Sequence, residues 1–274
     1  YSLGEDRWIA WQFDCPEQGN GVVQAFRRAQ SPREANRLKL NGVDPATVYS
    51  VTNLDVAGSI EMTGRNLPGL DVEAGQFLHW RFLAPGLWWH QHPFSVSAAP
   101  TAARLRITVR NLGKGSAALM AVKPGTRVMI EGPYGIFSDQ VRTTEALTLV
   151  GIGIGIAPIR AVLEATTVVA GKATVILRAS RTEELYLVRE IDALCRAKGA
   201  RLITLVGPRA ARRNGTSSWV PQSHAGLTLA DMVPYLAQSD VYVCGPQAAS
   251  DLVIGDALAA GVPAAAIHNE RFSW

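Results

Sequence analysis

A glycine-rich loop between an apolar run and a helical run is the part of this chain best suited to holding a charged ligand. Glycines stand at positions 151, 153 and 155, after the apolar run 146–150 and before the helical run 158–164. Without Cβ atoms, such a loop lets backbone N–H groups approach a ligand closely. The helix start adds N–H donors and partial positive charge, which favour a phosphate. Pro158 is expected at the first helical position, where its missing N–H costs nothing.

The spacing of this loop departs from the common dinucleotide fingerprint. A Gly-x-Gly-x-x-Gly pattern would require glycine at 156 or 158, where the chain has Ile156 and Pro158. A tight turn that binds no ligand is therefore the alternative interpretation of the loop taken alone.

Composition describes a globular protein of two ordinary domains. The chain has 274 residues, 47% of them hydrophobic and 18% charged, and a net charge of +4. It contains no block of Lys and Arg, so we expect no nucleic-acid partner. Arg209, Arg212 and Arg213 form a small cluster, interpreted either as a solvated loop or as a phosphate contact.

The cysteines and histidines do not predict a metal site. The three cysteines are Cys15, Cys195 and Cys244. No Cys-x-x-Cys pair occurs, which excludes a zinc ribbon and a plant-type iron–sulfur cluster. This sparse usage fits a reducing compartment. His90 and His92 lie close in sequence but have no third ligand nearby, so we expect no metal.

The sequence contains no targeting or membrane-spanning signal that we recognise. The longest apolar stretch, 147–170, is interrupted by glycines, a proline and charges, and no signal-peptide pattern is present. The chain begins with Tyr instead of Met, which suggests a fragment or a processed form. We expect it to be cytoplasmic, either free or at the cytoplasmic face of a membrane.

Residues 1–44 are expected to form an arm or linker, and residues 45–141 a small β-barrel. The arm combines an aromatic run at 8–13 with a basic, helix-compatible connector around 27–37. The barrel is predicted from short runs of strand character separated by turn residues. These runs are 48–54, 59–63, 76–83, 104–110 and 127–131.

Residues 142–274 are predicted to form a parallel α/β domain. Strands at 147–150, 173–177, 202–206 and 240–244 alternate with helical stretches. One of these, 184–194, places Leu187, Ile191 and Leu194 on one face. Such alternation predicts a parallel sheet with helices on both sides.

Five short motifs and a C-terminal signature follow one another along the chain. They occupy residues 92–97, 110–119, 132–137, 153–158, 243–247 and 268–274. In this order they resemble the ferredoxin–NADP reductase superfamily, and within it the flavin dehydrogenase module of bacterial ferric-reductase-like and NADPH-oxidase-like proteins. The likeness covers about residues 45–274. It implies an antiparallel Greek-key barrel that binds FAD, followed by a parallel-sheet α/β domain that binds NAD(P).

The first motif begins with His92, Pro93 and Phe94, the form found in the oxidase and ferric-reductase branch where other members have Arg-x-Tyr-Ser. The resemblance implies that Phe94 lies along the flavin and that Ser95 contacts its redox-active end, with Val96 beside them. A flavin needs such a flat apolar wall and a few oriented hydrogen bonds. A plain strand with a proline-bent edge is the alternative.

The second motif is expected to hold the FAD pyrophosphate. Arg110 or Lys114 would supply charge, and N–H groups at Gly115, Ser116 and Ala117 would supply donors. Ser116 is also expected to cap a short helix, and a capped helix with no ligand is the alternative. The third motif, Gly-Pro-x-Gly at 132–135, resembles a turn that closes the flavin domain.

The fourth and fifth motifs imply a nicotinamide site. The pyridine-nucleotide loop comprises Gly153, Gly155, Ile156, Ala157 and Pro158. Gly245 and Pro246 follow Cys244, which in the family lies beside the nicotinamide carbon that gives up hydride without acting as a nucleophile. A small buried cysteine is the alternative.

The C-terminus resembles the family ending Glu-x-aromatic. Phe272 would stack on the flavin where the nicotinamide must later lie, and Trp274 is the other candidate for this role. Glu270 would relay or stabilise charge near Ser95. The alternative is a frayed aromatic tail.

The choice of nucleotide favours NADPH, with NADH as the alternative. Ser180 and Arg181 follow the second predicted strand of the α/β domain, and Arg209 follows the third. Arginine suits a 2′-phosphate because its planar fork matches phosphate oxygens. No acidic residue immediately follows the second strand to bind a ribose 2′-hydroxyl, since Glu183 comes later.

The predicted function is therefore that of a flavoprotein reductase. Hydride would pass from NAD(P)H to FAD, and single electrons would then pass to an acceptor. Haem in a membrane domain, a ferric chelate, a ferredoxin and a flavodoxin all remain open as acceptors. A non-catalytic flavin- or nucleotide-binding subunit that docks on a partner is the alternative, favoured if Ile152 blocks the nucleotide. A sugar- or oligonucleotide-binding barrel lacks the aromatic and basic strand faces it would need.

Overall fold

The computed structural model describes residues 8–15, 17, 20–27, 43–44, 46–52, 59–63, 72–101, 104–111, 113–211 and 217–272. The chain divides into two compact units, residues 1–71 and 72–274. Each unit is described by itself. None of the helices among these residues is long and apolar enough to cross a membrane.

The first unit contains two antiparallel hairpins. The strands β1 (Trp8–Cys15) and β2 (Asn20–Arg27) pair along their whole length. The strands β3 (Val48–Thr52) and β4 (Ser59–Thr63) form the second hairpin, which confirms two predicted strands. The β1–β2 hairpin was not predicted. The expected basic connector falls outside the described residues, apart from the arginine that ends β2.

The second unit begins with a three-stranded antiparallel sheet. The strand β5 (Phe77–Phe82) lies between β6 (His92–Ser95) and β7 (Val128–Tyr134). Leu78 and Trp80 of the central strand are buried. The predicted strands 76–83 and 127–131 are confirmed by this sheet.

The predicted strand 104–110 is wrong. In this region the structure forms only single bridges, Val96 with Ile107 and Thr101 with Arg104. The alternation of Arg and Thr with apolar residues predicted a strand with one apolar and one polar face. Instead, Arg106 and Arg110 are part-buried and make ion pairs with acidic residues of the α/β region. The charged side of this segment is therefore a contact surface and not the exposed face of a regular strand.

The short helix α1 (Lys114–Leu119) follows this segment. Its N-cap is Gly113, so the prediction that Ser116 is the cap is wrong. Ser116 is instead the third helical residue, and its Oγ accepts a hydrogen bond from the Gly113 amide at 3.1 Å. The hydroxyl reaches back to the cap because the side chain of the third helical residue lies next to the N-cap amide.

A five-stranded parallel sheet forms the rest of the unit, in the order β10-β9-β8-β13-β14. Its strands are β8 (Ala146–Ile152), β9 (Ala173–Ala179), β10 (Arg201–Val206), β13 (Ser239–Pro246) and β14 (Ile267–Phe272). All four predicted strands are confirmed, and β14 is an addition. Every residue of β8 and β9 is buried, as expected of strands covered on both faces.

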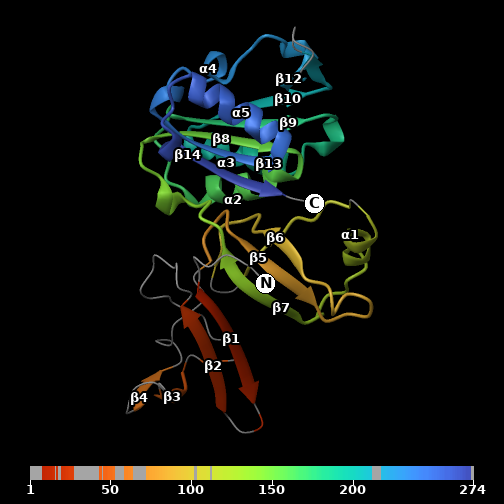
Figure 1. Ribbon diagram of the computed structural model, residues 1–274, viewed down its shortest axis with the longest axis vertical. Coiled ribbons are helices and arrows are strands. Elements are labelled where there is room, and N and C mark those ends of the chain that lie inside the picture. The colour runs from red at the N-terminus through yellow and green to blue at the C-terminus, as the bar shows by residue number, and fades with distance from the viewer. Residues whose placement is uncertain are drawn as a thin grey trace. The chain divides into compact units, whose positions relative to one another are not determined.

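Helices cover both faces of this sheet (Figure 1). The helices α2 (Ile156–Ala165) and α3 (Val188–Lys198) pack with Leu149, Val175 and Tyr242 in one core cluster. The helices α4 (Leu229–Met232) and α5 (Gln247–Ala259) pack with Val150 and Val243 in the other. Neighbouring strand residues thus point into different clusters, which is the period-two alternation of a strand.

Short elements complete the α/β fold. The strands β11 (Arg209–Ala211) and β12 (Ser217–Pro221) pair as a small antiparallel ribbon. Single 3-10 turns occupy Asp139–Val141, Gly153–Gly155, Thr182–Glu184, Gln222–His224, Leu236–Gln238 and Ala264–Ala266.

Two predicted helix starts are displaced. Helix α2 begins at Ile156, so Pro158 occupies its third position instead of its first. An N–H there still has no intrahelical acceptor, so the proline is tolerated. The helix predicted from 184 begins only at Val188, because residues 182–184 form a 3-10 turn and Leu187 adopts a left-handed φ of 57°. Ile191 is buried as expected.

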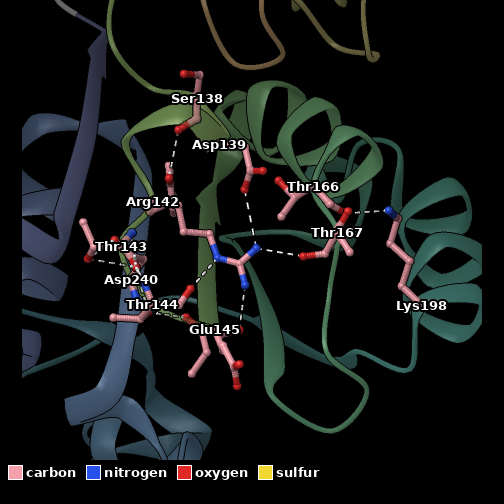
Figure 2. Close-up of polar contacts among 12 residues, drawn as sticks. Ser138, Asp139, Arg142, Thr143, Thr144, Glu145, Thr166, Thr167, Lys198 and Asp240 are labelled. Atoms are coloured by element: carbon pink, nitrogen blue, oxygen red, sulfur yellow. Dashed lines mark hydrogen bonds and ion pairs between the residues drawn. The ribbon is translucent and has the colours of Figure 1, made fainter.

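The segment that joins the two sheets of this unit is held by two charged side chains (Figure 2). The Arg142 guanidinium donates to the carbonyls of Thr144, Glu145 and Thr167 at 2.7–2.8 Å. The buried carboxylate of Asp240 accepts hydrogen bonds from the amide of Thr144 at 2.6 Å and from its hydroxyl at 2.7 Å. This connection is therefore pinned at the amino end of the parallel strands.

Asp240 also contacts the ring of His268, with Nε2 2.7 Å from Oδ1. Burial alone would raise the pKa of the Asp240 carboxyl, but the hydrogen bonds from His268 and Thr144 outweigh it and hold this pKa below its ordinary value. A carboxyl whose pKa is lower in the folded state contributes stability above its unfolded pKa. That contribution is lost as the pH falls through the folded pKa.

We therefore predict that Asp240→Asn lowers the free energy of unfolding by about 2–4 kcal/mol at pH 7. Below pH ~4 the difference between the wild type and the variant should shrink, because the wild-type carboxyl becomes protonated. Urea unfolding from pH 7 to pH 3 measures both effects. Asp139→Asn, which removes an exposed acid 3.5 Å from Arg142, is the control and should cost less than about 1 kcal/mol. Equal losses in the two variants would contradict the assignment.

Candidate functional site

The loops after β8 and β13 meet at the carboxyl edge of the parallel sheet. These two strands are neighbours, and the chain continues from them to helices on opposite faces. Such a switch point is where open α/β sheets bind ligands. A Cβ at Gly155 would stand 2.1 Å from the carbonyl oxygen of Cys244, and one at Gly245 would stand 2.6 Å from the Cβ of Ile152. The fourth and fifth motifs are thus in direct backbone contact.

Ile152 points into the core and away from this edge. It is 8% exposed and belongs to the cluster of α4 and α5. Its Cβ packs against Gly245. The side chain therefore occupies space under the loop, which removes the one feature that favoured a non-catalytic protein.

Cys244 is a neutral, fully buried thiol. It is 0% exposed and lies opposite Glu270 in the β13–β14 register. Burial raises the pKa of the Cys244 thiol well above its ordinary value, and the charge of Glu270 raises it further. A thiol of this kind offers bulk and polarisability at the end of the strand and no nucleophilic thiolate.

Glu270 lies where the parallel sheet meets the antiparallel sheet. Its Oε2 is 3.2 Å from the position a Cβ would take at Gly135, and the ring of Phe77 is 3.6 Å from the same position. Phe77 is in turn the register partner of Ser95 in the β5–β6 pair. The carboxylate therefore has Cys244 on one side and the neighbours of Ser95 on the other. The predicted proximity of these three groups is thus supported through shared neighbours.

The strand β6 presents a pair of parallel rings beside a buried hydroxyl. The rings of His92 and Phe94 are stacked, with centroids 5.7 Å apart and planes 6° apart. The Oγ of Ser95 and the Nε2 of His92 are buried and have no hydrogen-bond partner among the described residues. Burial lowers the pKa of His92, and the nearby His90 lowers it further, so the ring is neutral at pH 7.

These features fit a flat heteroaromatic ligand such as a flavin. An orphaned buried hydroxyl is costly unless a ligand group completes its hydrogen bond. The backbone of the strand is held from behind, because the Trp80 indole donates to the Phe94 carbonyl at 3.1 Å. Pro93 is exposed, whereas Val96 is fully buried and bridges to Ile107.

The residues expected at the FAD pyrophosphate are only partly brought together. Gly115 and Ser116 lie in the first turn of α1, as an anion site requires. The Ala117 amide, however, bonds to the Gly113 carbonyl at 2.9 Å and is used within the helix. Arg110 donates to Glu184 at 3.0 Å. The acid that binds Arg110 was not predicted.

Ser180, Arg181 and Arg209 share one edge of the sheet. The first two follow β9, and the third follows the neighbouring strand β10. The ends of these strands are joined by a hydrogen bond from the amide of Gly207 to the carbonyl of Ala179 at 3.1 Å. Arg181 and Arg209 are exposed, in keeping with a site for a charged group of a ligand.

Arg178 is a positioning residue that was not predicted. It is 3% exposed and donates to the carbonyls of Ala179, Trp219 and Gly207, the last two at 2.7 Å. Burial lowers the pKa of its guanidinium, and the charge of Arg209 lowers it further. A single arginine in the mostly apolar run 173–179 is the signal that could have found it.

The two aromatic residues predicted to cover the flavin lie at or beyond the end of the described residues. Trp274 is beyond the described residues, and for Phe272 only the backbone is described, paired with Pro246 at the end of β14.

Two stretches of the chain match known families of domains. Residues 45–138 match the model of an FAD-binding domain, and residues 149–253 match that of an oxidoreductase NAD-binding domain. Ferredoxin–NADP reductase B of Sorangium cellulosum is 30% identical over 73% of this chain and 85% of its own length. A flavohemoprotein of Xylella fastidiosa is 28% identical over 75% of this chain, and the match covers about half, 52%, of that protein.

Solved structures share the fold. The flavohem-like FAD/NAD-binding domain of a nitric oxide dioxygenase from Vibrio cholerae has a TM-score of 0.57 and 22% identity, over 74% of this chain and 86% of that one. A ferredoxin–NADP⁺ reductase from Plasmodium falciparum with bound 2′-phospho-AMP has a TM-score of 0.56 and 10% identity, over 87% of this chain and 100% of that one.

The chain belongs to the ferredoxin–NADP reductase superfamily. Its two matched domains are an FAD-binding domain and an oxidoreductase NAD-binding domain. The predicted superfamily, the order of a β region before a parallel α/β domain, and the pair of cofactor-binding domains are confirmed.

The backbone contact at the switch point yields a prediction. Gly155→Ala would place a methyl group against the Cys244 carbonyl, so either the loop or β13 must move. We expect a loss of about 2–4 kcal/mol in the free energy of unfolding. Gly255→Ala, in α5 with open space around the glycine, is the control and should stabilise by up to about 1 kcal/mol. Thermal and urea unfolding measure both, and a neutral Gly155→Ala would contradict the contact.

Proposed function

We propose that this chain is an FAD-containing reductase that takes hydride from NAD(P)H and delivers single electrons to a separate acceptor. The observation that carries the proposal is the contact of Gly155 with Cys244 at the switch point, with Glu270 reaching from there to the antiparallel sheet. We assign residues 45–141 to the FAD domain and 142–274 to the NAD(P) domain, with residues 1–44 as an arm or linker.

Bound FAD would supply the hydride-accepting ring and the step from two-electron to one-electron transfer. The residues of β6 would hold this ring: Phe94 and His92 as a flat wall, Ser95 as a hydrogen-bonding group, and Pro93 and Val96 as flanking contacts. The unpartnered Oγ of Ser95 supports this assignment. Arg110 and the amides of Gly115 and Ser116 in the first turn of α1 would hold the pyrophosphate, with Ala117 as a neighbouring contact whose own amide bonds to Gly113.

The nicotinamide nucleotide would bind across the loops after β8 and β13. A Cβ at Gly153 would meet nothing within 4 Å, so a ligand can approach the backbone there. Gly155, Ile156, Ala157 and Pro158 would carry its pyrophosphate at the start of α2, where amide donors gather. Gly245 and Pro246 would line the nicotinamide end.

Cys244 and Glu270 would set the environment of the reacting carbon. The neutral thiol packs beside the ring without forming a bond, and the carboxylate holds negative charge on the side of Ser95. Phe272, or Trp274 in its place, would cover the flavin until the nicotinamide displaces it. The rate of hydride transfer would be raised mainly by alignment, because a nicotinamide and a flavin held in contact react in an effectively unimolecular step.

The nucleotide is expected to be NADPH, with Ser180, Arg181 and Arg209 around its 2′-phosphate and NADH as the weaker alternative. The acceptor is expected to be haem in a membrane domain, a ferric chelate, or a small redox protein such as ferredoxin or flavodoxin. We place the chain in the cytoplasm or at the cytoplasmic face of a membrane.

A visible spectrum tests the proposed function directly. Purified protein reconstituted with FAD should be yellow and should be bleached by NADPH under anaerobic conditions, and added ferricyanide should restore the colour. The same titration with NADH gives the nucleotide preference. A protein that stays colourless with added FAD, or a yellow protein that neither nucleotide bleaches, would support the alternative of a non-catalytic binding subunit.

Cys244 provides a sharper prediction. Cys244→Ala should lower the rate of flavin bleaching by about 10- to 100-fold because the nicotinamide loses the wall that aligns it. FAD content should be unchanged, since the thiol lies on the nucleotide side. Cys195→Ala, a buried thiol in α3, is the matched control and should bleach at the wild-type rate. Stopped-flow absorbance measures the rates, and equal rates in all three proteins would exclude the role given to Cys244.

A further inference from the structure

Glu184 binds the two arginines that were expected to contact different nucleotides. Its Oε1 accepts hydrogen bonds from Arg110 and from Arg181, both at 3.0 Å. Its Oε2 accepts the backbone amide of Ser180 at 3.2 Å. Arg110 comes from the segment between β6 and α1, and the other donors come from the end of β9. One carboxylate thus joins the flavin side of the protein to the nucleotide side.

The donors around this carboxylate are those of an anion site. Two guanidinium groups and an amide converge on it, a set that suits phosphate as well as carboxylate. The Glu184 side chain is 12% exposed, whereas that of Arg181 is 70% exposed and that of Arg110 is 29% exposed. The carboxylate therefore lies inside the cluster, and the arginines face a ligand that arrives from solvent.

The carboxylate is ionised at neutral pH. Burial would raise the pKa of Glu184, but the hydrogen bond from Arg181 and the charge of Arg110 outweigh it and lower that pKa. An ionised acid bonded to Arg181 opposes a second anion there in two ways. It occupies guanidinium donors, and it repels a phosphate that carries close to two negative charges.

We propose that Glu184 is an internal counter-anion that competes with the 2′-phosphate of the nucleotide for Arg181, and so restrains the preference for NADPH over NADH. The inference rests on the proposed function, since it concerns how that site selects its nucleotide. Glu184 is a specificity-determining residue in this scheme and takes no part in hydride transfer.

The same geometry links the two cofactor sites. When a phosphate engages Arg181, the carboxylate keeps Arg110 as its partner. When a pyrophosphate engages Arg110, the carboxylate keeps Arg181. When both anions are bound, each arginine is shared between Glu184 and a phosphate group, so each nucleotide changes how strongly the carboxylate holds the other arginine.

Direct binding of nucleotide fragments tests the proposal without relying on turnover. We would measure by calorimetry the affinity of the FAD-loaded full chain for 2′-phospho-AMP and for AMP. Glu184→Gln keeps the shape of the side chain and removes its charge. We expect it to bind 2′-phospho-AMP about tenfold more tightly and AMP with unchanged affinity.

Glu183→Gln is the matched control. Glu183 is the adjacent exposed acid, and its charge also acts on Arg181. The control removes the same formal charge without removing the hydrogen bonds to the arginines, and we expect a change of less than about threefold in the affinity ratio. Equal changes in the two variants would show a general charge effect and overturn the specific role of Glu184.

A second variant, Arg181→Gln, removes the group for which Glu184 and the 2′-phosphate compete. Arg181→Gln should bind 2′-phospho-AMP and AMP alike, and adding Glu184→Gln to it should change the ratio by less than about twofold. A large effect of Glu184→Gln in that background would overturn competition for Arg181. If Glu184→Gln melts early, Glu184→Asp keeps the charge and draws the carboxylate back by one methylene, and we expect an intermediate ratio.

The outcomes separate this inference from the proposed function. A wild-type protein that NADPH bleaches, but whose ratio is unaffected by Glu184→Gln, overturns the inference alone. Equal weakening of both fragments in Glu184→Gln also overturns it, because that result marks a purely structural contact. A wild-type protein that binds neither fragment and is not bleached overturns both.

Discussion

The carbonyl of Cys244 stands where the side chain of residue 155 would be, and the rest of the site depends on this contact. It brings the end of β13 against the loop after β8, so that two segments almost 90 residues apart form one surface. Only glycine leaves room for the approach, because any Cβ would lie 2.1 Å from the carbonyl oxygen. The register of β14 on β13 then places Glu270 beside Cys244. The steric contact at Gly155 thus aligns the loop with the thiol, and the β13–β14 register adds the acid.

A row of charged side chains joins the region of 97–110 to the helices of the α/β fold. The Glu190 carboxylate accepts hydrogen bonds from the guanidinium groups of Arg106 and Arg160, both at 2.9 Å. Glu164 pairs with Arg160 and also accepts the amide of Ala99 at 2.5 Å. Part-exposed pairs of this kind add little net stability individually. Their directional hydrogen bonds fix the position of segment 97–110 on the helices α2 and α3, which an apolar contact would leave free to slide.

The sequence predicted those features that follow from local pattern. Apolar runs marked β8, β9, β10 and β13, because strands covered on both faces are buried throughout. The short motifs marked both loops at the switch point. Features set by distant partners escaped prediction. The segment 104–110 alternates like a strand, yet Arg106 and Arg110 bind acids from the α/β fold. The strand β14 lies at the edge of the sheet and carries mostly polar and charged residues, which conceals it in a pattern search.

The same limit explains why Glu184 was missed. The prediction considered only the positions immediately after the second strand of the α/β domain, and these hold serine and arginine. A 3-10 turn at residues 182–184 then folds the chain back, and the third residue of that turn reaches the amide of Ser180. Glu184 is therefore four residues from Ser180 in sequence but in hydrogen-bond contact with it in the structure.

Neutral groups and charged groups occupy different parts of the proposed site. The groups assigned to the ring systems are neutral, since burial lowers the pKa of His92 and raises that of the Cys244 thiol. The arginines lie apart from these groups, on the segments assigned to the phosphates. A charge buried against a ring would favour one redox state of that ring, because the protein interior screens the charge only weakly. A charge near solvent is screened by water and salt. In the proposed arrangement the rings lie among neutral groups and Glu270 is the acid whose field acts between them, and its place opposite Cys244 follows from the β13–β14 register.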